Sequence, residues 1–387
     1  MAKLLQNIKG DKVIWGVVII LTVFSILAVY SSTTTLAYRT RQGNTEYYLI
    51  KHLSILVFGF ILMFLAHKVK YIYYARISQL AIIISVPLLL YTLLFGASIN
   101  EASRWTTLPG INLMFQPSDF AKLALIMFVA RMLAKRQENI KDFKSAFIPI
   151  LTPVLLICGL ILPANFSTAA LLFVTCIVLM FIGRVNLRYI GAMIGIGGVV
   201  LALFLSFLYF SPKSSGRLGT WQNRIEHFVD GDSEENYQVE QAKIAIANGG
   251  LLGKLPGNSM QKNFLPNPFN DFIYAIIIEE YGLAGAVIVL LMYLILLYRG
   301  IRIVSKSPGN YGAFLAIGVT FSLVFQAMIN MAVAVNLVPV TGQPLPLVSM
   351  GGTSIWFTSI ALGIILSVSK EQESGDMPTN ELQNAEA

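Results

Sequence analysis

Long apolar segments in close succession constrain this chain more than any other feature of its sequence. A helix that crosses the ~30 Å hydrocarbon core of a bilayer needs about 20 mainly apolar residues, and irregular backbone is not tolerated against lipid. The apolar segments are residues 13–30, 53–66, 77–97, 120–134, 147–162, 168–183, 189–210, 272–298, 311–338 and 354–369. Several are short for a full crossing, but together they predict an all-α integral membrane protein, a bundle of ten transmembrane helices.

The composition agrees with a membrane protein and excludes several other classes. Hydrophobic residues make up 56% of the chain and charged residues only 12%, about half the charged fraction of a soluble domain. The two cysteines, Cys158 and Cys176, lie inside apolar segments, which argues against a disulfide framework. The histidines His52, His67 and His227 lack the spacing of metal ligands, so we predict no dedicated metal site. A net charge of +8 reflects membrane topology here, and no nucleic-acid partner is expected.

The distribution of Lys and Arg predicts the orientation. Cytoplasmic loops of membrane proteins carry an excess of both residues, and long loops are discounted because they translocate largely regardless of charge. If the N-terminus is cytoplasmic, the short outer loops contain only Arg39, Arg41, Lys51 and Arg104. We therefore predict cytoplasmic termini, at residues 1–12 and 370–387, around a membrane domain at residues 13–369. The polar tail at 370–387 should be disordered, and the first apolar segment reads as a retained anchor because no cleavage site follows it.

A polar motif, Gln-Pro-Ser-Asp-Phe-Ala-Lys at residues 116–122, stands at the start of the fourth segment. Ser118 or Asp119 can cap a helix there, and Asp119 and Lys122 are spaced to form an ion pair. Charged groups at membrane depth are costly, so each is a candidate functional residue. A capped helix with a satisfied ion pair and a cation that meets an anionic ligand are equally good interpretations. Arg104, in the preceding outer loop, is a second candidate cation.

The long loop at residues 211–270 is predicted to lie outside the cell. Loops of this length are usually functional or disordered, and its aromatic and glycine content favours order. Residues 237–247 show a helical pattern, which predicts a short amphipathic helix at the interface. Arg224 and Lys262 are candidate anion-binding residues. The glycines lack phosphate-loop spacing, so a nucleotide site is not supported.

Carboxylates mark the junction between this loop and the eighth segment. Asp271 would lie at the outer mouth of that helix, where it can either cap the helix or act in chemistry. Glu279 and Glu280 lie deeper, with Glu279 about 12 Å further along the axis at 1.5 Å per residue. Both need partners within the membrane. We expect that one of them can pair with Lys122 across the bundle.

The segment at residues 339–354 contains three prolines and three glycines. Such a sequence cannot form a helix exposed to lipid, and irregular backbone at this depth must line a cavity or pack inside protein. We therefore predict an ordered re-entrant turn on the outer side.

These segments together resemble the SEDS family (shape, elongation, division and sporulation), whose members include FtsW, RodA and SpoVE. The resemblance covers residues 13–369 and rests on three motifs: Gln-Pro-Ser-Asp-Phe-Ala-Lys at 116–122, Asp-Phe-Ile-Tyr-Ala at 271–275 with Glu-Glu-Tyr-Gly at 279–282, and Pro-Val-Thr-Gly at 339–342 with Gly-Gly-Thr at 351–353. It implies ten transmembrane helices and polymerisation of lipid II as a peptidoglycan glycosyltransferase. It also implies that Asp271 is the catalytic residue and that Gln116, Asp119 and Lys122 are important. The motifs lean toward FtsW, the division member.

Two family motifs are missing from this chain. Many members carry Pro-Glu-x-His-Thr before the aspartate, where this chain has Pro-Asn-Pro-Phe-Asn at 266–270. Many carry an aspartate in Gln-Pro-Asp-x-Gly-Thr between spans five and six, where this chain has Ala-Asn-Phe-Ser-Thr at 164–168. If the chain is active, these groups are not essential in it, and the catalytic role concentrates on Asp271.

The implied chemistry needs one carboxylate. A sugar 4-hydroxyl attacks the anomeric carbon of a lipid-pyrophosphate donor, and a general base removes its proton. The leaving pyrophosphate needs cations, for which Arg104, Lys122, Arg224 and Lys262 are candidates, with Gln116 as a further binding group and Glu279 and Glu280 as supporting residues. A divalent cation, Mg or Mn, can assist, although the sequence contains no dedicated ligand cluster.

The resemblance also implies partners and a place in the cell. The family works with a class B penicillin-binding protein and other divisome proteins in the bacterial inner membrane, here at the division septum, and its product is undecaprenyl pyrophosphate. Three alternatives stay open: a lipid II flippase, motivated by the intramembrane charges, an elongation-type polymerase like RodA, and a division scaffold that recruits partners through its acidic tail.

Overall fold

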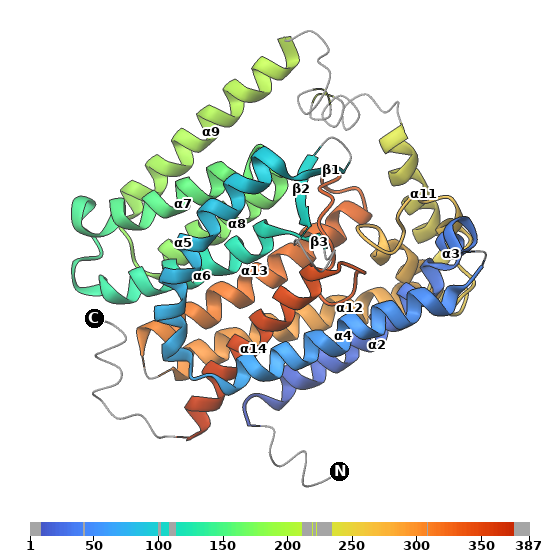
Figure 1. Cartoon of the computed structure of the whole chain (residues 1–387), viewed down its shortest axis with the longest axis horizontal. Helices are drawn as coiled ribbons and strands as arrows, with labels where there is room; N and C mark the ends of the chain where they lie inside the picture. The colour runs from blue at the N-terminus through green and yellow to red at the C-terminus, as the bar shows by residue number, and fades with distance from the viewer. Residues whose placement is uncertain are drawn as a thin grey trace. The chain divides into compact units, whose positions relative to one another are not determined.

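The structure is a computed structural model (Figure 1), which describes residues 9–41, 43–99, 102–107, 114–210, 219, 222, 234–307 and 309–374. Helices dominate it. The helices are α2 (Lys12–Ser32), α3 (Thr34–Arg41), α4 (Thr45–Lys68), α5 (Tyr71–Phe95), α6 (Pro117–Lys135), α7 (Ile148–Ile161), α8 (Phe166–Ile182), α9 (Leu187–Phe210), α11 (Glu234–Gly249), α12 (Ile273–Lys306), α13 (Asn310–Ala334) and α14 (Thr353–Ser374), with short helical turns at Gln137–Asn139, Phe143–Phe147 and Gln261–Asn263.

Every predicted apolar segment coincides with a helix. In the described part of the chain, eight helices are long and apolar enough to cross a membrane, and α8 is a shorter apolar helix. The chain is therefore a membrane protein with multiple spanning helices, as predicted. The count of ten crossings stays a prediction.

A small antiparallel sheet departs from the all-α expectation. It consists of β1 (Ala97–Ile99), β2 (Ala102–Thr107) and β3 (Met114–Phe115), in that order. Trp105 pairs with Ala97, and Thr106 with Phe115. Aromatic and β-branched residues favour strands, and the connection between α5 and α6 is too polar to continue either helix. This departure from an all-α fold is local, because the strands only link the helices α5 and α6.

The end of the chain also differs from the prediction. We expected a disordered tail from residue 370, but α14 continues to Ser374. The Gln372 side chain donates a hydrogen bond of 2.7 Å to the Ile303 carbonyl of α12, which ties this last turn to the neighbouring helix. Residues 375–387 lie outside the described part of the chain.

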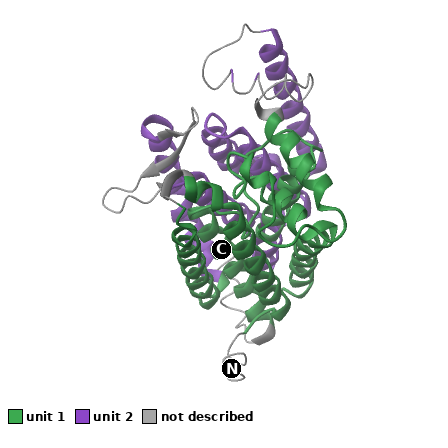
Figure 2. Ribbon diagram, turned by 90° about the vertical axis from the view of Figure 1, so that its right-hand side faces the viewer, with its two compact units in different colours: residues 1–71, 234–308, 319–377 green, residues 72–233, 309–318, 378–387 purple. Residues whose placement is uncertain are grey.

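The chain divides into two compact units (Figure 2). Unit 1 comprises Met1–Tyr71, Glu234–Pro308 and Val319–Met377, and unit 2 comprises Ile72–Ser233, Gly309–Gly318 and Pro378–Ala387. In unit 1, α14 packs along α4, and α12 along α2. Glycines permit the first contact: a Cβ on Gly363 would come within 2.4 Å of the Met63 carbonyl oxygen. In unit 2, α6 packs against α7 and α8.

Helix α12 is interrupted at Gly282, whose backbone (φ 66°, ψ −167°) is not helical. A break of this kind exposes backbone groups that need partners inside a membrane. Here the part of the long loop that directly follows α11 supplies them. The amides of Leu283 and Ala284 donate to the carbonyls of Gly250 (2.9 Å) and Leu251 (3.3 Å). The loop is thus built into the helix at the break.

This fit requires glycine. A Cβ on Gly282 would lie 2.4 Å from the Leu251 carbonyl oxygen, and one on Gly253 would lie 2.2 Å from the Glu280 carbonyl oxygen. Both glycines also have positive φ angles, 66° and 78°, which side-chain-bearing residues rarely adopt. The sequence around Gly282 therefore allows two backbones to meet at hydrogen-bonding distance.

Helix α11 confirms the predicted helical pattern at residues 237–247. Its apolar residues Val239, Ala242 and Ala245 are buried together with Phe272 and Ile276, at the start of α12. The spacing of three places the α11 residues on one face. This small core fixes the residue directly after Asp271.

Candidate active site

Asp271 lies in the turn that connects the long loop to α12. It is half-buried, whereas Phe272 and Ile273 after it are 1% and 0% exposed. The N-cap position belongs to Phe272, and no side chain caps the helix. Asp271 therefore does not cap α12, a role that we considered for it. Its backbone is fixed instead by Asn330 of α13, whose amide donates to the Asp271 carbonyl at 2.8 Å.

The irregular segment at residues 339–352 holds the same turn from the other side. The Asn330 amide also donates to the Gln343 carbonyl at 2.8 Å. One side chain therefore links the Asp271 turn to the irregular segment. The Ser349 hydroxyl donates to the Asn270 carbonyl. The Met350 amide donates to the Phe269 carbonyl at 2.9 Å. The prediction that this segment is ordered and packs inside protein is confirmed.

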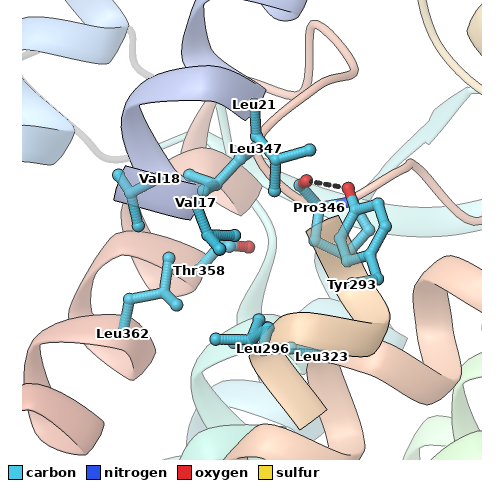
Figure 3. Close-up of a pocket in the computed structure, with 10 residues that line it drawn as sticks. All are labelled: Val17, Val18, Leu21, Tyr293, Leu296, Leu323, Pro346, Leu347, Thr358 and Leu362. Carbon is cyan, nitrogen blue, oxygen red and sulfur yellow. Dashed lines mark hydrogen bonds between the residues drawn. The ribbon is translucent and has the colours of Figure 1, made fainter. Parts of the chain in front are cut away.

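Residues Pro346 and Leu347 of the segment line a small apolar cavity (Figure 3). The other lining residues come from α2, α12, α13 and α14, and they are Val17, Val18, Leu21, Tyr293, Leu296, Leu323, Thr358 and Leu362. The Tyr293 hydroxyl donates to the Pro346 carbonyl at 2.6 Å. Leu347 has a φ of 64°, a conformation that costs a residue with a side chain about 1–2 kcal/mol. The surrounding contacts therefore hold a strained turn in place.

Glu279 is fully buried and accepts hydrogen bonds from the loop. The Lys254 amine lies 3.0 Å from its carboxylate, and the Ser259 hydroxyl lies 2.5 Å from it. The backbone amides of Met260 and Gln261 add bonds of 3.1 and 3.2 Å. Four donors satisfy a buried carboxylate well. For Glu279, the pairing with Lys122 that we considered is not observed, because its charged partner is Lys254.

Glu280 and Lys262 belong to a second buried group of polar side chains. The Ser31 hydroxyl of α2 donates to Glu280, and the Ser259 amide does so at 3.4 Å. The Lys262 amine donates to Ser31 at 3.3 Å and to the Gly257 carbonyl at 2.6 Å. Lys262 is only 9% exposed. In this structure its charge stabilises the loop, which weakens its candidacy as a pyrophosphate ligand.

The motif at residues 116–122 forms a corner of unit 2, where β3 leads into α6. The N-cap is Gln116, without a side-chain cap, and Pro117 occupies the first helical turn. The prediction that Ser118 or Asp119 caps α6 is therefore wrong. The Gln116 amide instead donates to the Ser118 hydroxyl at 3.0 Å. The predicted ion pair is present: the Lys122 amine lies 3.4 Å from the Asp119 carboxylate.

The two remaining candidate cations are Arg104 and Arg224. Arg104 belongs to β2, which contacts α6, so its backbone lies in the sheet that leads into the Gln116 corner. Nothing is described of its side chain. Arg224 lies outside the described residues.

Comparison with known proteins assigns the chain to a family. The sequence model FTSW_RODA_SPOVE, described as a cell cycle protein, matches residues 11–374. The chain belongs to this family.

Two relatives illustrate the similarity. Stage V sporulation protein E of Bacillus subtilis is 32% identical over 371 residues, covering 94% of this chain and 98% of that protein. A protein of Geobacter metallireducens named probable peptidoglycan glycosyltransferase FtsW is 33% identical over 372 residues, covering 93% and 95%. The family model's match at residues 11–374 includes every candidate residue discussed above.

Solved structures show that the family fold is shared. A chain from a study of the coordination of polymerization and crosslinking by a peptidoglycan synthase complex superposes with a TM-score of 0.71 at 23% identity, covering 94% of this chain and 98% of that one. The rod shape determining protein RodA of Thermus thermophilus gives a TM-score of 0.67 at 22% identity, with 95% and 99% covered.

Sequence reasoning missed three residues that organise the site of this family member: Ser31, Asn330 and Ser349. Asn330 had a detectable signal, because Gln326 and Asn330 are spaced by one helical turn within an apolar segment, and paired polar residues there face protein. The Gln326 amide indeed donates to the Pro344 carbonyl at 2.9 Å. For Ser31 and Ser349 no sequence signal exists, since serine is common in membrane helices and turns.

The described residues contain no group of three His, Cys, Asp or Glu side chains close enough to hold a metal ion. Carboxylates and carbonyl oxygens are the ligands that Mg or Mn prefers, and the buried carboxylates Glu279 and Glu280 already accept hydrogen bonds from the loop. Their arrangement does not fit a resident metal site.

Proposed function

We propose that this member of the family is a peptidoglycan glycosyltransferase that polymerises lipid II. The names of several similar proteins support the activity. The observation that carries the proposal to a residue is the position of Asp271 at the junction of loop and helix. Its backbone is bonded to Asn330 and its neighbour Phe272 is buried in a core. A half-buried carboxylate on so constrained a turn suits a general base, which must be held near its substrate.

In the proposed reaction Asp271 takes a proton from the sugar 4-hydroxyl as that oxygen attacks the anomeric carbon of the donor. The new glycosidic bond forms while the bond to pyrophosphate breaks, and undecaprenyl pyrophosphate leaves with its electron pair. A single displacement inverts the anomeric centre, so an α-linked donor gives a β-linked strand. The leaving group is already stable, and no general acid is required.

Positive charge must stabilise the departing pyrophosphate. Lys122 and Arg104 are the preferred candidates, because Lys122 lies in the second turn of α6 and Arg104 lies in the strand that contacts this helix. Gln116 is a further candidate for binding. Arg224 stays a candidate from the sequence alone, and Lys262 is less favoured because its amine already binds Ser31 and Gly257. A divalent cation, if one takes part, would arrive with the pyrophosphate.

The proposed topology has ten crossings, both termini in the cytoplasm and residues 211–270 outside the cytoplasmic membrane. This arrangement would leave the lipid tails of donor and acceptor in the bilayer while their head groups meet near Asp271. The similarity to a chain of a peptidoglycan synthase complex supports a transpeptidase partner of the class B penicillin-binding type. We propose action at the division septum with other divisome proteins, since several similar proteins are named FtsW.

The test is polymerisation of purified lipid II by the purified chain in liposomes, with and without a class B penicillin-binding protein. Asp271→Asn should lower the rate by about 10²–10⁴-fold, the usual contribution of a general base, while leaving thermal stability unchanged. Asp142→Asn is the matched control, because Asp142 is an exposed carboxylate whose hydrogen bonds are local, to residues of the helical turn that it caps. Polymerisation by the Asp271 variant at the parent rate would remove this residue as the base.

The same liposomes distinguish the flippase alternative. Translocation of lipid II without chain growth by the parent protein would favour it. The charges that motivated this alternative have local partners in the structure, Asp119 for Lys122 and Lys254 for Glu279. They therefore give a translocation path no additional support.

A further inference from the structure

A buried serine–histidine pair connects α2, α4 and the irregular segment of unit 1. Ser25 of α2 and His52 of α4 are both 0% exposed. The Ser25 hydroxyl oxygen lies 2.8 Å from the His52 Nε2 atom and 2.8 Å from the Val348 carbonyl oxygen. Polar groups in the interior of a membrane protein are costly to bury. A buried polar pair is therefore a candidate for a structural or functional role. Nothing in the proposed chemistry uses either residue directly.

We propose that Ser25 and His52 are positioning residues for Asp271. The inference rests on the proposed function of Asp271 for its kinetic consequence, although its structural basis is independent of that function. The pair acts through Val348 and Ser349, which are adjacent in the chain. Neither residue touches the reacting groups.

Proton counting fixes the direction of the hydrogen bonds. A serine hydroxyl has one proton, and a carbonyl oxygen can only accept. If the proton pointed at His52, the Ser25 and Val348 oxygens would face each other at 2.8 Å with no proton between them. The hydroxyl must therefore donate to Val348, and His52 must donate from Nε2. The His52 Nδ1 atom is then a bare acceptor, and within the described chain it has no hydrogen-bond partner.

The contact reaches Asp271 in two short steps. Val348 is followed by Ser349, whose hydroxyl donates to the Asn270 carbonyl and accepts from the Leu345 amide at 2.8 Å. Asn270 directly precedes Asp271. A shift of Val348 would move Ser349 and release the peptide group that joins Asn270 to Asp271.

The opposite side of the segment is held independently. Figure 3 shows Tyr293 of α12 bonded to the Pro346 carbonyl, two residues before Val348, and both Leu347 and Leu21 of α2 line the small cavity. Leu21 lies one helical turn before Ser25. The segment is thus fixed by α12 on one side and by α2 and α4 on the other. Loss of the serine–histidine pair would leave the hydrogen bond between Tyr293 and Pro346 in place, so the variants should fold.

Hydrogen exchange tests the positioning role without any assay of activity. In nanodiscs, Ser25→Ala and His52→Leu should raise the exchange of amides in the peptide at 265–275, and His52→Gln, which keeps a donor near the Nε2 position, should restore protection. Ser78→Ala is the matched control: Ser78 is also 0% exposed, but its hydroxyl bonds only its own helix, at the Ala75 carbonyl. Unchanged exchange at 265–275 in Ser25→Ala and His52→Leu would overturn the inference.

The histidine tautomer is a second test. The chain has only 3 histidines, so ¹⁵N-histidine spectra can be assigned with single substitutions at His67 and His227. His52 should show a protonated Nε2 and an unprotonated Nδ1, and the Ser25→Ala substitution should shift its signals. A protonated Nδ1 in the parent protein would contradict the proposed direction of the bonds.

Kinetics give the functional consequence. Misplacement of a base by a fraction of an ångström should lower kcat for lipid II polymerisation by about 10–100-fold with little change in KM, and His52→Gln should recover most of the loss. An equal loss in Ser78→Ala, or a change in KM alone, would reject positioning of the base. If the parent protein fails to polymerise, the proposed function fails, and the exchange and tautomer results still decide whether the pair positions the turn.

Discussion

The Asp271 turn of unit 1 and the Gln116 corner of unit 2 contain the main candidate residues, and they are built in opposite ways. The Asp271 turn is fixed by side chains distant in sequence, including Asn330 and Ser349. At the Gln116 corner the described side-chain bonds include short-range ones: Gln116 bonds Ser118, and Lys122 pairs with Asp119 within one helical turn.

This difference suggests a division of roles. A group that transfers a proton must be held to within a fraction of an ångström, which takes contacts from several directions. A cation that meets a charged head group acts through long-range attraction and tolerates a looser setting. The tightly held backbone of Asp271 and the Lys122–Asp119 pair, within one turn of helix, fit these two requirements.

The largest effect should follow from Gly282→Ala, because the unit 1 site depends on the loop built into the α12 break. The added Cβ would lie 2.4 Å from the Leu251 carbonyl oxygen, at backbone angles that essentially only glycine adopts. We expect loss of folded protein or rapid proteolysis within residues 250–265. The measurement is limited proteolysis and thermal unfolding in detergent.

Gly250→Ala is the matched control for that substitution. Gly250 also has a positive φ, 55°, but a Cβ there would meet no atom within 4 Å. The cost should be only about 1–2 kcal/mol from backbone strain. If both variants lose the loop equally, the close contact at Gly282 is not what holds it.

An intermediate effect is expected from Asn330→Ala, which removes both bonds that join the Asp271 and Gln343 carbonyls. Two unsatisfied buried carbonyls cost about 1–3 kcal/mol each, and the polymerisation rate should fall by about tenfold or more as the turn loosens. Rate and melting temperature are both measured. Asn258→Ala is the control, since Asn258 is exposed and bonds only the Lys254 carbonyl. An unchanged rate in Asn330→Ala would mean that the Asp271 turn is as tolerant as the Gln116 corner.

The smallest effect concerns the ion pair of the Gln116 corner. A double-mutant cycle of Asp119→Asn and Lys122→Met, followed by unfolding in mixed micelles, should give a coupling of about 0.3–1 kcal/mol, typical of neighbouring helical ion pairs. The separation of 3.4 Å is long for a strong pair. Coupling well above 2 kcal/mol would show that this corner is as constrained as the Asp271 turn.

The sequence predicted what local spacing determines. Apolar segment length located the membrane helices, and the i,i+3 spacing located the Asp119–Lys122 pair. It also placed Asp271 at the start of α12 and identified the irregular segment from its prolines and glycines. Each of these depends on residues within one continuous stretch of the sequence.

The remaining features depend on contacts between distant residues, which one sequence does not reveal. The pairing of Lys254 with Glu279 was not predicted, because nothing local indicates that the loop returns to Glu279. The break at Gly282 was hidden because isolated glycines are common in apolar helices. The sheet was missed because its strands, of 3, 6 and 2 residues, are too short for a clear alternation.

The contact between α4 and α14 has a consequence for synthesis. These helices pack closely in unit 1, through Gly59 and Gly363, yet the whole of unit 2's main segment is translated between them. At a translation rate of about 5–20 residues per second, α14 is synthesised on the order of a quarter of a minute to a minute after α4. During that time α4 must be covered by lipid or by an assisting protein, and a chain that ends before residue 353 lacks the helix that packs along α4 in unit 1.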